Sequence, residues 1–167
     1  MSMPSRPRRG SVLLEFSLTS IPLLFVLISM IWICMGMWQY HTLAEAVNFT
    51  VRYAAVHGAG CAGQSCALTV AEIESALAGR AVGVPASLIN VTLTSSASTV
   101  TCNPLSSCSS NSSAWPSLAG NLAVTTDISI AATAQFISPI SMWVPHYGTQ
   151  QFNGVTLGAN ATQPVVY

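Results

Sequence analysis

The sequence predicts an α+β protein, in which a long N-terminal helix packs on a small antiparallel sheet. Three observations lead to this prediction. Residues 16–44 contain no Asp, Glu, Lys or Arg, which is typical of a transmembrane helix. Residues 41–54 then carry polar and apolar side chains at helical spacing. Residues 88–94 and 122–136 alternate between apolar and polar side chains, as half-buried strands do.

The composition is far from that of a soluble domain. Of the 167 residues 51% are hydrophobic and only 6% are charged, whereas soluble domains carry about 25% charged residues. The chain has no lysine, and beyond residue 9 its only basic residues are Arg52 and Arg80. Because a nucleic-acid partner requires a cluster of Lys and Arg against its phosphates, we expect no nucleic acid among the partners.

The apolar run over residues 12–38 is long enough to cross a membrane. At ~1.5 Å per residue such a helix is ~40 Å long, against a hydrocarbon core of ~30 Å. Arg6, Arg8 and Arg9 precede the run, and the positive-inside rule therefore predicts a cytoplasmic N-terminus. We expect one transmembrane helix over residues 11–40, with the remainder of the chain outside the membrane.

A cleaved signal peptide is the first alternative. Its apolar region has about 7–15 residues, and the run here is nearly twice as long. The A-E-A sequence at residues 44–46 resembles a cleavage site but lies too far from the arginines. Cys34 is a poor lipoprotein site, because bulky Trp32 and Ile33 occupy positions that require small residues. Both processing routes are therefore disfavoured.

The helix is expected to continue beyond the membrane as an amphipathic extension over residues 41–57. One stripe at helical spacing is polar, and a second is apolar. The polar stripe consists of His41, Glu45, Asn48 and Arg52, and the apolar stripe of Leu43, Val47, Val51 and Ala54. Pro22 lies within this helix and removes a backbone hydrogen bond, so a kink or local unwinding is expected near residues 18–22.

Residues 58–167 are predicted to form a small exported α+β domain. Residues 58–63 match G-x-G-x-x-G formally, but a helix precedes them where a dinucleotide site has a strand, so a helix stop and loop are expected. T-V-A-E at residues 69–72 is a capping box that begins a helix to about Ala78.

The remaining elements of this domain are strands and loops. Residues 103–117 are predicted to be a polar loop, and Pro139 and Pro145 are expected to end the strand that begins at residue 122. A short strand is expected at residues 154–157.

The cysteines outside the membrane helix form two local pairs, and four cysteines permit three connectivities. Local pairing, Cys61 with Cys66 and Cys102 with Cys108, is favoured because it would close the two Gly/Ser-rich loops of an exported domain. Zinc is the alternative, but the spacings C-x4-C and C-x5-C are poor and bring no histidine ligands. We therefore expect neither a metal nor another cofactor.

The sequence offers little support for catalysis. There is no G-x-S-x-G, no H-E-x-x-H and no P-loop. Asp127 is the only aspartate and lies on the polar face of a predicted strand, while Glu72 and Glu74 point to different sides of a helix. We expect no catalytic residue and no enzyme activity.

Glu15 is the exceptional residue of the apolar run, because a charged side chain inside a bilayer costs about 3 kcal/mol on insertion scales. It stands in R-R-G-S-V-L-L-E-F-S-L, residues 8–18, as the fifth residue after Gly10. This stretch resembles type IV pilin-like proteins. With Pro22 and V-R-Y-A-A-V-H-G at residues 51–58, it resembles in particular the TadE-like minor pseudopilins of the tight-adherence (Tad/Flp) pilus.

That resemblance is good over residues 8–57 and loose over residues 120–141, where the family has a late strand running into a proline-marked end; residues 60–118 match no motif of it. It implies that residues 1–10 are a cytoplasmic leader, which a prepilin peptidase removes by cutting between Gly10 and Ser11. Cleavage would create an α-amine on Ser11, one helical turn from Glu15. The amine that pairs with Glu15 could belong to the same subunit or to a neighbour. Without cleavage, Glu15 would lie near the lipid headgroups.

The resemblance further implies a minor pilin or pseudopilin of the bacterial inner (cytoplasmic) membrane that assists assembly of a Tad-type pilus for adhesion or secretion. Its partners would be the prepilin peptidase, other pilin-like subunits, the Tad assembly platform and the lipid bilayer. The alternative is a permanently anchored single-pass membrane protein with an extracytoplasmic binding domain.

Overall fold

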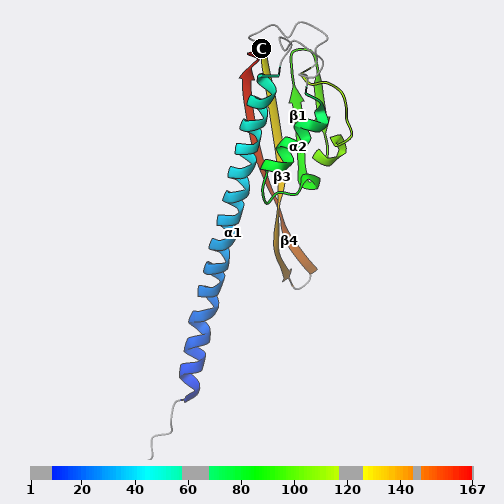
Figure 1. Ribbon diagram of the computed structural model, residues 1–167. Coiled ribbons are helices and arrows are strands. Elements are labelled where there is room, and N and C mark those ends of the chain that lie inside the picture. The colour runs from blue at the N-terminus through cyan, green and yellow to red at the C-terminus, as the bar shows by residue number, and fades with distance from the viewer. Residues whose placement is uncertain (1–8, 58–67, 117–125, 145–147, 167) are drawn as a thin grey trace, which may run out of the picture. The chain divides into compact units, whose positions relative to one another are not determined.

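The computed structural model describes residues 9–57, 68–116, 126–144 and 148–166. The chain divides into two compact units, Met1–Gly36 and Met37–Tyr167. Helix α1, Arg9–Ala55, contributes to both units. The second unit also contains helix α2 and a four-stranded antiparallel sheet, so the predicted α+β fold is confirmed (Figure 1).

In the first unit, α1 is α-helical through residues 18–22, although Pro22 lies inside it. Of the kink or local unwinding that we expected near this proline, the local unwinding is not present. Pro22 removes only its own N–H bond to the carbonyl of Leu18, and the hydrogen bonds of the adjacent turns hold the helix.

In the second unit, α1 has the amphipathic character that its two stripes predict. All four residues of the apolar stripe have no exposed surface, and all four of the polar stripe are exposed. The first hydrogen bond from this helix to the rest of the unit comes from Gln39, whose Nε2 donates to the carbonyl of Gly83 at 3.1 Å. Gly83 has φ of +86°, which favours glycine at this turn after α2.

Helix α2, Val70–Arg80, begins at the predicted capping box. The N–H of Glu72 donates to Thr69 Oγ1 at 3.2 Å, and the N–H of Thr69 donates to Glu72 Oε2 at 2.7 Å. The helix runs two residues beyond the predicted Ala78, and Ala81 closes it by donating to the carbonyl of Leu77 at 2.9 Å. Val70, Ile73 and Leu77 bury its apolar face.

The sheet has the strand order β2-β1-β3-β4, with every pair antiparallel. Its strands are β1 (Ile89–Thr94), β2 (Thr99–Cys102), β3 (Asp127–Val144) and β4 (Gly148–Pro164). The alternation predicted for β1 and β3 is confirmed, since the apolar residues 89, 91 and 93 are buried, as are residues 128, 130, 132 and 134. In Figure 1, β3 and β4 continue as a two-stranded ribbon beyond the end of β1.

The expectation that Pro139 ends β3 is wrong. The strand continues to Val144, but the register between β3 and β4 shifts between Phe136 and Ile137 and again between Ile137 and Ser141. Pro139 thus lies where the regular pairing of β3 with β4 is interrupted, so its missing N–H does not remove a hydrogen bond of the regular pattern. The partner strand, β4, is correspondingly much longer than the predicted residues 154–157.

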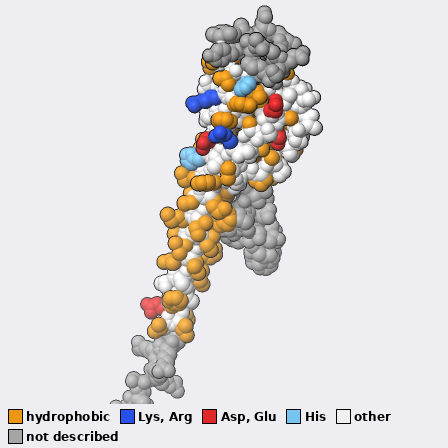
Figure 2. Space-filling view, in the orientation of Figure 1, with side chains coloured by type: hydrophobic (Ala, Val, Ile, Leu, Met, Phe, Trp, Pro, Cys, Tyr) orange, Lys and Arg blue, Asp and Glu red, His pale blue; other side chains and the backbone are white. Residues whose placement is uncertain are grey.

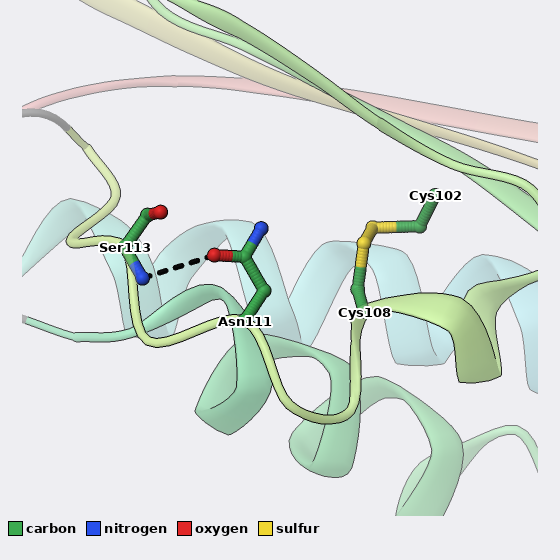
Figure 3. Close-up of a disulfide and its surroundings, with 4 residues drawn as sticks. All are labelled: Cys102, Cys108, Asn111 and Ser113. Atoms are coloured by element: carbon green, nitrogen blue, oxygen red, sulfur yellow. Dashed lines mark hydrogen bonds between the residues drawn. A yellow bond between two sulfur atoms is a disulfide. The ribbon is translucent and has the colours of Figure 1, made fainter.

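The predicted polar loop over residues 103–117, which the structure describes up to residue 116, also supplies part of the core. The 3-10 helix η2, Leu105–Cys108, buries Leu105 and Cys108, and Trp115 is buried as well. Cys102 and Cys108 form a disulfide with a Cα–Cα distance of 5.7 Å (Figure 3). Next to it, Asn111 Oδ1 accepts the N–H of Ser113 at 3.0 Å. Another short 3-10 helix, η1 (Ala86–Leu88), leads into β1.

Candidate functional site

The N-terminal part of α1 presents an apolar surface over its whole circumference. None of its most apolar stretch is buried, and no other helix of the described residues is long and apolar enough to cross a membrane. Figure 2 shows apolar side chains gathered over this part of the helix. Such a helix, near the N-terminus, fits a membrane-anchored protein.

Within residues 12–36, the serine and threonine hydroxyls are all bonded to the backbone of the helix itself. Ser17 Oγ donates to the carbonyl of Leu14 at 2.9 Å, Thr19 Oγ1 to that of Glu15 at 3.0 Å, Ser20 Oγ to that of Ser17 at 3.4 Å, and Ser29 Oγ to that of Phe25 at 2.7 Å. Since lipid offers no hydrogen-bond partner, these bonds suit a helix in a bilayer.

Glu15 lacks such a bond. Its side chain is exposed, and within the described residues it forms no hydrogen bond and no ion pair. Among the carboxyl and hydroxyl side chains of residues 12–36, only that of Glu15 has no hydrogen-bond partner. Gly10 and Ser11 lie in the first turn of α1, so the backbone of Ser11 is one helical turn, about 6 Å along the axis, from that of Glu15.

Residues 10–52 match the family model described as TadE-like protein. This segment of the chain is TadE-like. The match includes Gly10, Glu15 and Pro22 and extends through the amphipathic stripes to Arg52, so the family resemblance of this stretch is confirmed. No curated protein and no solved structure matches the chain. The family that this segment resembles is associated with the Tad pilus and is not a family of enzymes.

The remaining candidate residues are distributed along the chain. Cys61 and Cys66 lie outside the described residues, as do residues 1–8 of the predicted leader and the G-x-G-x-x-G stretch. Cys34 is a free, exposed cysteine on the apolar helix. Asp127 is exposed at the start of β3. Within the described ranges, no group of three or more His, Cys, Asp or Glu side chains could hold a metal ion.

The two glutamates of α2 differ in their surroundings. Hydrogen bonds from the backbone and side chain of Thr69 lower the pKa of the Glu72 carboxyl. Partial burial raises the pKa of the Glu74 carboxyl, which has no hydrogen-bond or ion-pair partner among the described residues. Glu72 is engaged as a helix cap, and the charge of His57 also contributes to its lowered pKa.

The sequence did not point to a group of side chains between α1 and α2. Arg80, the last residue of α2, places its guanidinium carbon 3.5 Å from the centroid of the Phe49 ring. Phe49 stacks in turn on Tyr53, with ring centroids 6.1 Å apart and planes at 8°. The spacing of Phe49, Tyr53 and His57, four residues each, is a signal for such a row of rings on one helix face.

Proposed function

We propose that this protein is a minor pilin-like subunit of a Tad-type pilus, inserted in the bacterial inner membrane, processed by a prepilin peptidase and then assembled. One observation supports this above the others: a carboxylate without a partner, Glu15, lies in an exposed apolar helix, five residues after Gly10 and within the TadE-like segment. The TadE-like match supports pilin-like subunits as its partners.

The proposed topology puts the N-terminus in the cytoplasm. Three arginines precede the apolar helix, and within residues 10–51 there is no Lys or Arg; this asymmetry supports the orientation through the positive-inside rule. The second unit is then extracytoplasmic, in agreement with the Cys102–Cys108 disulfide, because disulfides persist in oxidising compartments. A cut between Gly10 and Ser11 occurs on the cytoplasmic side of the membrane.

The cut provides the partner that Glu15 lacks. It leaves a positive α-amine on Ser11, one turn from the carboxylate. Because a lone charge in the membrane costs about 3 kcal/mol, pairing with an amine is favoured. If the amine belongs to a neighbouring subunit, the pair forms only when two helices dock in register, and Glu15 then acts as an assembly contact.

Mass spectrometry of the membrane-extracted protein tests the processing. We expect an N-terminus at Ser11 in the wild type and an intact leader in Gly10→Trp, while Ser11→Ala serves as the neighbouring control and is cut normally. An intact leader in the wild type overturns the proposal and leaves a permanently anchored single-pass protein with an extracytoplasmic binding domain.

Incorporation into sheared filaments tests the role of Glu15. Glu15→Ala should still insert in the membrane, but its amount in the filament fraction should drop. Asp127→Ala removes an exposed carboxylate outside the apolar helix and should assemble as the wild type does. Normal incorporation of Glu15→Ala contradicts the pairing.

A further inference from the structure

A hollow of about 470 Å³ lies on the second unit between α1 and the end of α2. Its lining comes from four residues of α1 at helical spacing, together with the last residue of α2. These residues are Glu45, Asn48, Phe49, Arg52 and Arg80. The hollow therefore contains two of the chain's five basic residues, and both of those that lie beyond the N-terminal cluster.

Both guanidinium groups in the hollow are available for a partner. Within the described residues, neither Arg52 nor Arg80 forms a hydrogen bond or an ion pair. Glu45 lines the same hollow but is seven residues from Arg52, about 10 Å along the helix axis, which is too far for an ion pair. The hollow thus holds two arginines against one carboxylate, that of Glu45, and keeps an excess of positive charge.

The aromatic row fixes Arg80 in place. Its guanidinium stacks on Phe49, which stacks on Tyr53, and the Tyr53 ring lies 4.6 Å from that of His57. Stacking uses the face of a guanidinium and leaves its N–H donors free at the edge. An arginine held in this way loses little side-chain freedom when it binds a carboxylate with two hydrogen bonds.

The ligand could be a lipid phosphate or a carboxylate of another protein. Arg52 is twelve residues beyond Tyr40, about 18 Å along the axis of α1, and Tyr40 is the last residue of the predicted transmembrane helix. This distance puts the hollow beyond the lipid headgroups of a membrane that ends near Tyr40. A carboxylate on a neighbouring subunit remains as the ligand.

The chain itself supplies a fitting carboxylate. Glu74 is partly buried and has no partner among the described residues, and this burial raises the pKa of its carboxyl. A guanidinium would relieve that cost. Glu74 and Arg80 are six residues apart on α2, which puts them about 120° apart around the helix, so Glu74 faces away from its own hollow. The carboxylate and the two arginines can meet only between two copies of the chain.

We infer that the hollow formed by Phe49, Arg52 and Arg80 binds Glu74 of a second copy of this chain. The contact joins the hollow of one copy to Glu74 of another, either reciprocally across a two-fold axis or head-to-tail. A contact between subunits agrees with the proposed pilus function, on which this inference rests.

Charge reversal in the full-length protein tests the contact. Two differently tagged copies are produced in the same membranes, crosslinked, and the fraction of mixed dimers is measured. Arg80→Glu and Glu74→Arg should each lower that fraction about tenfold or more, as truncation of a charged interface pair does. The double variant, with both changes in every copy, should restore the dimer, because the two positions then carry exchanged charges that are again opposite across the contact.

Asp127→Arg is the matched control, since it makes the same change of charge at an exposed carboxylate elsewhere on the unit. It should leave the mixed dimer unchanged. An unaffected Glu74→Arg overturns the inference, as does a double variant that stays monomeric although its Cys102–Cys108 disulfide forms normally. Loss of a crosslink to a different protein, with self-crosslinking unchanged, also overturns it.

The N-terminus of each variant is determined by mass spectrometry in the same samples. If the wild-type protein is cut at Ser11 but the charge-reversal variants self-associate as the wild type does, the contact is contradicted and the proposed function stands. If the protein keeps its leader but the double variant restores the mixed dimer, the contact is present and the proposed function is contradicted.

Discussion

Leu43→Ala tests whether the amphipathic end of α1 holds the second unit together. The Leu43 side chain is completely buried in the core that α1, α2 and the sheet share. Removing three carbon atoms from it forfeits ~2.4 kcal/mol at ~0.8 kcal/mol per buried CH₂. A cavity adds to this cost, and buried Leu→Ala changes fall at about 2–5 kcal/mol. Since domains unfold with about 5–15 kcal/mol, this single change should remove a large part of the stability.

The assay must report on the second unit, because the apolar part of α1 stays helical in detergent. Pulse proteolysis of the full-length protein in micelles, over a range of urea concentrations, meets this requirement. With a urea dependence of about 1–3 kcal/mol per molar, Leu43→Ala should lower the midpoint by about 1–3 M. Glu45→Ala, an exposed neighbour on the same helix, should change the unfolding free energy by less than about 0.5 kcal/mol. Equal midpoints for the two variants would refute the burial of Leu43.

Four further predictions use the same assay. Thr69→Ala removes the acceptor for the Glu72 N–H and should cost about 1 kcal/mol, with an unchanged midpoint counting against the cap. Because the pKa of Glu72 is lowered on folding, its ionised carboxylate contributes fully to the free energy of unfolding above pH 4.5, and this contribution is lost as the pH falls through the lowered pKa. Glu72→Gln should remove this part of the loss of stability in acid. The pKa of Glu74 is raised, so the pH dependence is opposite: its contribution to the free energy of unfolding is complete below pH 4.5 and is lost as the pH rises through the raised pKa. Glu74→Gln should abolish that loss. Replacing Cys102 and Cys108 together by serine should cost about 2 kcal/mol, and a reducing agent that lowers the wild-type midpoint should leave this variant unaffected.

The elements that sequence reasoning predicted correctly are those with a local physical signal. The two stripes of α1 repeat at helical period, the T-V-A-E box satisfies two backbone donors, and β1 alternates with period two. Each of these patterns depends only on residues that are neighbours in the sequence. Glu15 was found in the same way, as one carboxylate in a long apolar run.

The features that the sequence did not predict depend on contacts between distant residues. β2 is only four residues long, and its pairing with β1 rests on a turn in which Ser95 Oγ donates to the carbonyl of Ser98. Pro139 ends a strand by local rules, but the register shift against β4 accommodates it. Trp115 is one aromatic residue among serines, and no periodicity marks it as part of the core. Arg80 reaches Phe49 only because α2 packs beside α1.

The hydroxyl groups of α1 that are bonded to its own backbone affect the transfer of the helix from lipid to a protein environment. The hydroxyls of Ser17, Thr19, Ser20 and Ser29 have acceptors within their own helix, and those acceptors travel with it. Moving the helix from lipid into contact with other protein therefore breaks none of these hydrogen bonds. The transfer free energy then depends on apolar packing and on Glu15, whose carboxylate is the only one in residues 12–36. A helix of this kind can be withdrawn from a bilayer without first being unfolded.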